Sequence, residues 1–434
     1  MTVETIKNFD REYITQFSKQ NQEPAWLLEL RLQSLDQIQE LELPKLEKTK
    51  IDKWNLLNFT HVVENEKISS VESLPEVVRG FLSQEENAST LLIHKDSTAI
   101  YQSVNAELES KGVIFTDIKT ALVKHGELLS KYMNKIVTGT EHKVSALHTA
   151  LFNSGVFLYI PKNVEVDIPI QSLFWQANGN AGLFPHILIV AEDNSKVTYV
   201  ENSFSSASEE SVHNYVAEVF VGKGAKVTFA AVDNLGTQTT SYIYRRSKVD
   251  QDARIEWALG QMNNGNTVSD NTTILSGNGS TGDTKSVVIG TGEQSLNFVQ
   301  KMHQFGHYTD GEMLSHGVMK DSARAIFNGI TKIEKGAVKS TGEQSERVLM
   351  LNEKARGDAN PILLIDENVE RAGHAASVGN VNPNQLFYLM ARGLTRAEAE
   401  RLIILGFLAP VIENIPIEEL KQRLVEVIER KISS

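Results

Sequence analysis

The spacing of apolar residues divides the chain into three regions. In residues 1–140, apolar side chains recur at helical spacing, as at Leu28 and Leu32. Short apolar runs between about residues 90 and 117 predict a few strands, and the spacing over residues 118–133 predicts a further helix. We therefore expect a mostly helical N-terminal domain over residues 1–140.

Apolar and polar residues alternate with a period of two over much of residues 141–372, which is typical of β-strands. A six-residue pattern recurs there: a turn residue, a small residue and a basic residue, then an apolar, a polar and an aromatic residue. It reads NSKVTY at residues 194–199, GAKVTF at 224–229 and DARIEW at 252–257, with a weaker copy, SARAIF, at 322–327.

The first three copies lie about 30 residues apart, a repeat length typical of solenoid proteins. Each unit contains strands and Gly or Asn turns but no amphipathic helix, so we expect the units to stack as a parallel β-helix. The predicted fold is mainly β, with a parallel β-helix core at residues 141–372 and helical domains on both sides. A large antiparallel sandwich is the alternative.

Residues 373–434 form the third region, and from about residue 380 onward it is helical in pattern. Asn382 and Pro383 are suited to a helix start, and Thr395 with Glu398 matches a capping box. Pro416 is expected to open a last amphipathic helix. The helices either cap the open end of the β-helix or offer an apolar surface to a partner, and the pattern does not separate these roles.

Length and charge narrow the class of protein. The chain has 434 residues, which predicts roughly two to three domains. Its formal net charge of −12 argues against binding to nucleic acid or an anionic membrane surface. The N-terminus has no leader pattern, and the longest strongly apolar stretch, residues 402–412, is too short to span a bilayer. We therefore expect a cytoplasmic protein.

Missing residue types and motifs limit the possible chemistry. The chain contains no cysteine, which excludes disulfides, zinc–thiolate sites and an iron–sulfur cluster held by its own thiolates. The Gly-x-Gly segments at residues 222–224 and 290–292 lack the ending of a P-loop, so we expect no ATP site. If the work of the protein needs ATP, another chain is expected to supply the ATPase.

Three histidines are candidate ligands. His303 and His307 are four residues apart, but their neighbours favour strand and turn over helix, so they are weak metal candidates that would need His316 or Glu312 as well. Otherwise they are ordinary strand histidines. His374 lies among small residues at the junction of strand and helix, and imidazole suits iron. The alternative for His374 is a turn histidine without a ligand.

Several motifs, in this order and spacing, resemble the SufB/SufD family of iron–sulfur cluster assembly proteins. They are EPAW at 23–26 with Arg31, ALFNSG at 150–155, YIPKNV at 159–164, FNG at 327–329 with Thr341 and Gln344, AGHAASVG at 372–379 and QLFYLMARG at 385–393. The resemblance spans nearly the whole chain. It is to SufD-like rather than SufB-like members, since the latter are expected to bring a cysteine that receives sulfur.

The resemblance implies a right-handed parallel β-helix and a role for His374. In SufD-like proteins, the matching histidine is implicated in building the nascent cluster together with a SufB-like partner. Many relatives have Cys-Ser-His-Gly where this chain has AGHA at residues 372–375, so any role of that thiol does not apply here. The nascent iron–sulfur cluster is therefore expected to be shared with the partner, not held by this chain alone.

The resemblance also implies partners and a non-catalytic role. It implies a SufB-like subunit paired through the β-helix, a SufC-like ATPase bound to the C-terminal helices, and a homodimer when the chain is alone. The candidate docking side chains on those helices are Phe387, Leu389, Leu402, Ile403 and Phe407. Two rivals stay open: a structural scaffold in which His374 has no ligand role, and a carbohydrate-active β-helix enzyme with acid and base groups along a groove.

Overall fold

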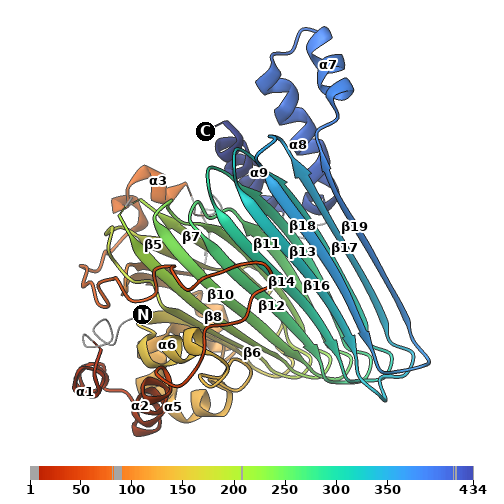
Figure 1. Ribbon diagram of the computed structural model, residues 1–434. Helices are drawn as coiled ribbons and strands as arrows, with labels where there is room; N and C mark the ends of the chain where they lie inside the picture. Colours follow the sequence, from red (N-terminus) through yellow and green to blue (C-terminus); the bar gives the residue numbers. More distant parts are fainter. Residues whose placement is uncertain are drawn as a thin grey trace.

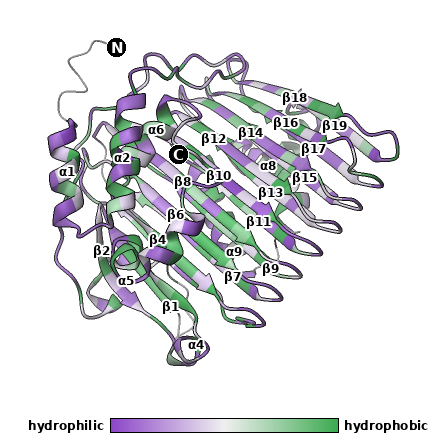
Figure 2. Ribbon diagram, turned by 90° about the horizontal axis from the view of Figure 1, so that it is seen from below, coloured by the Kyte–Doolittle hydropathy of each residue, from purple (hydrophilic) through white to green (hydrophobic). Residues whose placement is uncertain are grey.

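The computed structural model describes residues 9–80, 82, 90–206, 209–413, 415 and 418–433, and in these residues two large sheets face each other (Figure 1). The sheets alternate along the chain: each strand from β4 to β17 pairs in parallel with the strand two positions later. The core is therefore a parallel β-helix, as predicted, and not an antiparallel sandwich. Figure 2 shows hydrophobic residues along the strands of both sheets.

Within the described residues, one sheet has ten strands and the other has nine. The ten-stranded sheet contains, in spatial order, β19 (Arg371–Asn380), β17 (Thr341–Met350), β15 (Asp310–Met319), β13 (Thr281–Gly290), β11 (Arg254–Gln261), β9 (Lys226–Asn234), β7 (Lys196–Ser205), β5 (Ile170–Gln176), β1 (Thr90–Lys95) and β2 (Thr98–Ser103). The nine-stranded sheet contains β18 (Arg356–Ile365), β16 (Arg324–Ile333), β14 (Ser295–Gln304), β12 (Thr267–Leu275), β10 (Thr239–Val249), β8 (Ser211–Val221), β6 (Pro185–Ala191), β4 (Ser154–Ile160) and β3 (Ile114–Asp117).

The described helices lie before and after this core. The N-terminal ones are α1 (Arg11–Gln20), α2 (Ala25–Gln37), the short η2 (Val71–Ser73), α3 (Glu76–Arg79), α4 (Ala106–Ser110), α5 (Ile118–Tyr132) and α6 (Lys143–Leu151). The C-terminal ones are α7 (Pro383–Ala391), α8 (Arg396–Ile412) and α9 (Glu418–Ser433). Pro416, predicted to open the last helix, lies outside the described residues. Within the described residues, no helix has the length and apolar composition needed to cross a membrane.

The repeated sequence pattern marks equivalent positions in successive coils. Tyr199 of β7 pairs with Phe229 of β9, which pairs with Trp257 of β11. The ring centroids of these neighbours are 5.0 and 4.8 Å apart, so the aromatic residues stack as a ladder inside the β-helix. The weaker copy at residues 322–327 leads instead into β16, in the other sheet.

The first residue of each strong copy turns the chain into the next strand. Asn194, Gly224 and Asp252 have φ values of 56°, 65° and 53°, in the left-handed region. Glycine, asparagine and aspartate tolerate this backbone best, which explains the residue types at this position of the pattern. In the weaker copy the positive φ belongs to Asp321, one residue before the pattern begins.

The N-terminal helices cover the outer face of the nine-stranded sheet. Ile14, Leu27 and Leu129 of the helices belong to the same buried cluster as outward-facing side chains of the sheet such as Leu188 and Val216. Strands β1 to β3, from the first 140 residues, extend the two sheets. The first region is therefore packed against the β-helix along one side.

A buried ion pair joins two of the motifs quoted above. The Arg31 guanidinium contacts the Glu23 carboxylate at 2.7 Å, with side chains only 1% and 2% exposed. Arg31 also donates to the carbonyl oxygens of Ala150 and Phe152, at 2.9 and 3.0 Å. The EPAW and ALFNSG segments therefore meet at one arginine, which ties α2 to the start of the β-helix.

The C-terminal helices cover the outer face of the ten-stranded sheet, not its open end. Ile404 and Leu408 of α8 and Val427 of α9 pack with Val232 and Val287 of the sheet. The Lys431 ammonium group also donates to the carbonyl oxygens of Met262 and Asn263. The capping role considered from the sequence is therefore wrong, because the apolar residues of α8 and α9 match a broad sheet face.

Candidate functional site at the open end of the solenoid

The last two strands leave one end of the β-helix uncovered in the described part of the chain. β18 and β19 are edge strands, each paired on one side only. Their apolar side chains are exposed: Ile362 by 38%, Leu364 by 46% and Val378 by 42%. An edge of this kind offers unpaired backbone groups and apolar surface to another chain. The predicted domain boundary at residues 372/373 falls inside β19.

His374 lies on β19 and faces the interior of the β-helix. It pairs in parallel with Gln344 of β17. Aligned residues of parallel strands point to the same side, and Gln344 is 3% exposed inside the core. The imidazole is nevertheless exposed, because no further coil covers it, and it has no hydrogen-bond partner among the described residues.

Small residues surround His374 along β19. Ala372 and Ala376 occupy the neighbouring positions on the same side, and Gly373 points outward. A Cβ atom on Gly373 would lie 2.6 Å from the exposed Glu343 carboxylate, so a larger residue there would push that side chain aside. The AGHAASVG segment thus presents one imidazole with free space beside it.

The layer beneath His374 is polar and well connected. The Gln344 amide oxygen accepts a hydrogen bond from the Thr331 hydroxyl at 2.9 Å, and its nitrogen donates to the Gly329 carbonyl at 3.3 Å. Gln344 therefore lies directly below His374 in the fold and connects it to the FNG segment on β16, in the facing sheet. Two motifs that are 28 positions apart in sequence, from Gln344 to Ala372, meet at the open end.

Glu346 belongs to this layer and was missed by the sequence reasoning. It lies two residues after Gln344 on β17, is 3% exposed, and burial raises the pKa of its carboxyl to about 7. A signal was present: β17 alternates, and Glu346 occupies the same inward-facing set of positions as Gly342, Gln344 and Val348. A charged residue in an inward-facing position is unusual.

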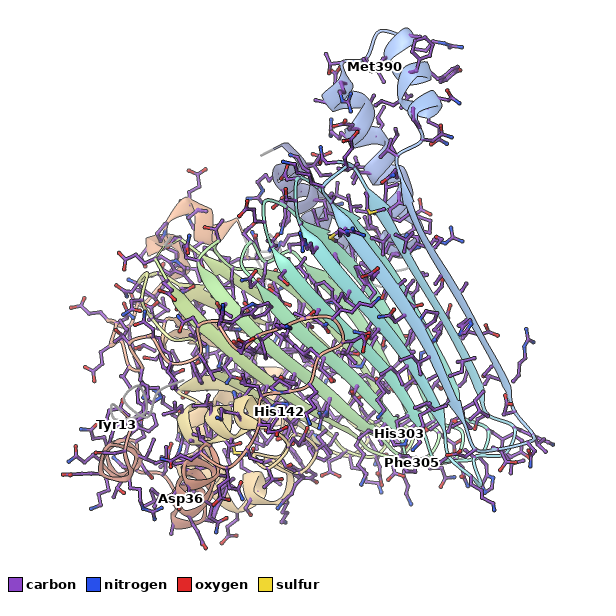
Figure 3. All side chains as sticks on the ribbon, viewed as in Figure 1. Tyr13, Asp36, His142, His303, Phe305 and Met390 are labelled. Carbon is purple, nitrogen blue, oxygen red and sulfur yellow. The ribbon has the colours of Figure 1, made fainter. Side chains whose placement is uncertain are left out.

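His303 and His307 lie elsewhere, where β14 turns toward β15. His303 is bonded to the Glu334 carboxylate at 2.6 Å, and His307 is exposed in the turn. Figure 3 shows His303 beside Phe305 at a corner of the solenoid, away from Met390 on α7. Among the described residues, no group of three or more His, Asp or Glu side chains could hold a metal ion. His316 instead bonds the Phe407 carbonyl at 2.7 Å.

A groove of about 680 Å³ lies between α7, α8 and the end of β17. Four of the five predicted docking residues line it: Leu389, Leu402, Ile403 and Phe407. The fifth, Phe387, is 72% exposed on α7. Figure 1 shows α7 projecting beyond the sheets, whereas Phe407 of α8 packs against the buried cluster of the ten-stranded sheet.

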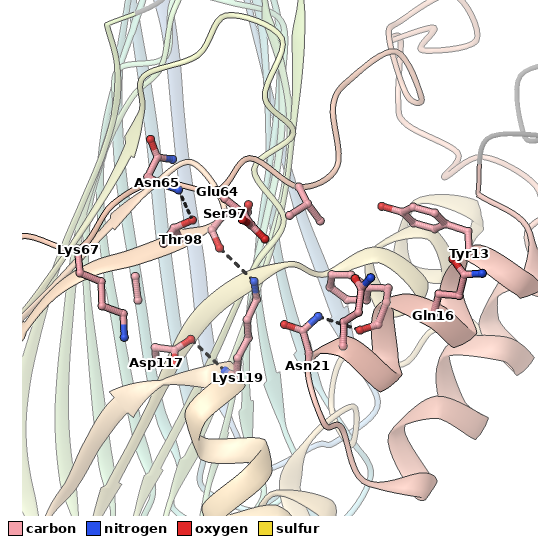
Figure 4. A pocket seen from close by; sticks show the side chains of 14 residues that line it. Tyr13, Gln16, Asn21, Glu64, Asn65, Lys67, Ser97, Thr98, Asp117 and Lys119 are labelled. Atoms are coloured by element: carbon pink, nitrogen blue, oxygen red, sulfur yellow. Dashed lines mark hydrogen bonds between the residues drawn. The ribbon is translucent and has the colours of Figure 1, made fainter.

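A second cavity, of about 600 Å³, lies between α1 and the β1–β2 hairpin (Figure 4). Its polar groups largely bond one another. The Lys119 ammonium donates to the Ser97 carbonyl at 3.2 Å, and the Asp117 carboxylate accepts from the backbone of α5. Burial lowers the pKa of Lys119. No sequence motif pointed to this cavity, and nothing in it matches the chemistry of the open end.

Known proteins match the chain over its whole length. Residues 8–172 match the family model described as "SufBD protein N-terminal region", and residues 174–407 match "SUF system FeS cluster assembly, SufBD core domain". The chain is 53% identical to "Iron-sulfur cluster assembly protein SufD" of Bacillus subtilis (strain 168), over 100% of both chains. It is 28% identical to a "SufBD family protein" of Staphylococcus saprophyticus, over 93% of this chain and 89% of the relative.

Proposed function

Because the chain belongs to the SufBD family of iron–sulfur cluster assembly proteins, we propose that it is the SufD-like subunit of a scaffold formed with SufB-like and SufC-like chains. In this scaffold it performs no catalysis of its own. It contributes one side of the site where a nascent iron–sulfur cluster forms, and it binds the ATPase that drives the complex. The complex works in the cytoplasm.

The observation that carries the proposal is the position of His374. An unpartnered imidazole lies on an edge strand at the uncovered end of the β-helix. Imidazole nitrogen is a suitable iron ligand, although the iron atoms of a cluster are usually held by thiolates. Since this chain has no cysteine, a partner must supply the thiolates, and His374 then completes a site shared by two chains.

The free edges of β18 and β19 support pairing with a SufB-like chain. Each edge presents a row of backbone groups, and Ile362, Leu364 and Val378 add exposed apolar surface. A second β-helix placed against this end would satisfy both and would bring its own residues next to His374. The same edge accounts for a homodimer of the chain when no partner is present.

The groove between α7 and α8 supports docking of a SufC-like ATPase. Its lining is apolar, with Leu389, Leu402 and Ile403 exposed to a partner, and α7 has no buried residue. β17 ends in this groove at Leu349 and also carries Gln344 beneath His374. β17 therefore connects the proposed docking groove with the proposed cluster site, and movement of the ATPase is expected to be transmitted along this strand.

Replacing His374 with alanine tests the proposal. In the complex with SufB-like and SufC-like chains, His374→Ala should leave assembly intact and lower the rate of cluster formation at least tenfold, because one ligand is lost. Cluster formation is followed by visible absorption and by the iron and sulfide content. His307→Ala, at an exposed turn histidine, is the matched control and should behave as wild type.

Wild-type cluster formation by His374→Ala would contradict the ligand role and would favour the structural scaffold. The two relatives are iron–sulfur cluster assembly proteins by name and give no support to the carbohydrate-active enzyme.

A further inference from the structure

A second side chain at the open end lacks a partner. The Oε2 atom of Glu346 is buried, in a residue only 3% exposed, and has no hydrogen-bond partner in the part of the chain that the structure describes. Buried carboxylates are normally paired with a cation or held by several donors, so an orphaned oxygen indicates a ligand that the isolated chain does not provide.

The fold makes room for this carboxylate. A Cβ atom on Gly329 of β16 would lie 1.9 Å from the Oε1 atom of Glu346, so any other residue at position 329 would displace the carboxylate. Gly329 belongs to the FNG motif and also accepts the hydrogen bond from Gln344. The β-helix thus leaves a space across its interior that the Glu346 carboxylate fills.

The carboxylate can be approached only from the open end. In the coil below, the aligned residue is Ser315, 3% exposed and bonded to Gln300 at 2.8 Å. In the coil above, the aligned residue is Ala376, which is small and exposed. The preceding coil therefore closes one side of Glu346, while Ala376 and, above Gly329, Pro361 of the last coil lie between its other side and the opening.

Glu346 and His374 face the same side of the sheet on neighbouring strands. His374 is aligned with Gln344, and Glu346 lies two residues further along β17. From the spacing of strands and of residues within them, the two Cα atoms are roughly 8 Å apart. Two long side chains at this separation can reach one metal ion between them.

We propose that Glu346 and His374 together bind ferrous iron for the nascent cluster, one through a carboxylate oxygen and the other through an imidazole nitrogen. This inference rests on the proposed function and adds a residue and a substrate ion to the same site. Oxygen and imidazole ligands both suit ferrous iron, and the partner chain would fill the remaining positions. No electron or group transfer is involved in this step.

The test compares two glutamates of one strand. Glu346→Gln keeps the shape of the side chain and removes its charge, and Glu343→Gln makes the same change on the outer face of β17. The full-length chain is titrated with Fe²⁺ without oxygen, against a chromophoric chelator. Glu346→Gln should weaken Fe²⁺ binding at least tenfold, whereas Glu343→Gln should change it less than twofold.

Thermal unfolding of each variant shows whether a loss of Fe²⁺ binding is caused by misfolding. Removing an unpaired buried charge should leave the stability of Glu346→Gln equal to or above that of wild type. Because one ion is shared, the double variant Glu346→Gln/His374→Ala should bind Fe²⁺ no more weakly than the weaker single variant. Additive losses, or wild-type Fe²⁺ affinity in Glu346→Gln, would overturn the inference.

The inference about Glu346 and the proposed function can fail independently of each other. If His374→Ala blocks cluster formation while Glu346→Gln binds Fe²⁺ as wild type does, only the inference about Glu346 fails. The reverse outcome has two parts. Glu346→Gln loses Fe²⁺ binding and the double variant binds Fe²⁺ no more weakly, yet His374→Ala forms clusters in the complex at the wild-type rate. In that case the iron site is supported and the proposed function fails.

Discussion

At the scale of single residues, the interior of the β-helix contains charged side chains that are not all compensated. Arg245 binds both oxygens of Asp233, at 2.9 and 3.0 Å. Glu201 accepts a hydrogen bond from the Tyr199 hydroxyl at 2.9 Å, but its Oε1 atom has no partner. Buried charged groups without a full set of partners lower the stability of the fold. A neutral residue at such a position is expected to raise the free energy of unfolding.

Glu201 makes stability depend on pH. Burial raises the pKa of its carboxyl from 4.5 to about 7, opposed by Arg245 and reinforced by Asp233. Folding therefore favours the protonated form, and the carboxyl destabilises the fold progressively as pH rises from about 4.5 to about 7. The penalty reaches about 3 kcal/mol above pH 7.

Glu201→Gln should remove this penalty. Its free energy of unfolding, relative to that of the wild type, should be about 2 kcal/mol higher at pH 8 than at pH 5. Urea denaturation at both pH values measures the difference. Glu343→Gln, at an exposed site, is the control and should shift stability equally little at both pH values. A relative stability of Glu201→Gln that does not change with pH would contradict the prediction.

At the scale of elements, the C-terminal helices divide their apolar residues between two tasks. The residues of α8 near its end, such as Leu408 and Val411, pack on the sheet, whereas Leu402 near its start is 50% exposed. A helix with apolar residues on both faces is suited to a position between the core and a partner. A substitution on the exposed face of α8 is expected to cost little stability, so the docking role can be tested without unfolding the chain.

Leu402→Glu should abolish docking of a SufC-like ATPase and leave the fold intact. A charge in the apolar groove must lose its hydration when the partner binds, so we expect at least a hundredfold weaker association. Co-purification and isothermal titration with the ATPase measure the effect. Val123→Glu, at a 52% exposed apolar residue of α5, is the matched control. Equal binding by Leu402→Glu and wild type would rule the groove out as the docking site.

At the scale of the whole molecule, helices cover part of each outer face of the β-helix, and one end of it is open among the described residues. The helices of the N-terminal region cover one face, and α8 and α9 cover the other. A partner β-helix that continues both sheets would join at the end formed by β18 and β19, where both edge strands lie. A solenoid whose last coil is uncovered is expected to associate with another chain.

Val378→Lys tests association through this end. Val378 is 42% exposed on the inner side of β19, so a lysine there should not disturb the fold. Its charge should weaken pairing with a SufB-like chain, and self-association of the isolated chain, at least tenfold. Analytical ultracentrifugation measures both. Val77→Lys on α3, at a residue 54% exposed, should have no effect, and unchanged pairing by Val378→Lys would exclude this edge.

The sequence by itself determined the repeat, the β-helix and the residue types at its turns. These properties follow from neighbouring residues: a period of two, a turn residue such as Asn194 and an aromatic residue such as Tyr199 recur in each coil. It also determined that the chain has no thiolate, and it singled out His374 as the candidate ligand.

Only the tertiary structure decided which surfaces the helices cover and which residues share the open end. Glu346 lies 28 residues before His374 in sequence, yet the pairing of β17 with β19 places both on one side of the last coils. Likewise, α8 and α9 cover a sheet face and not the open end. Such arrangements depend on the match between surfaces distant in sequence, and the local spacing of apolar residues does not encode that match.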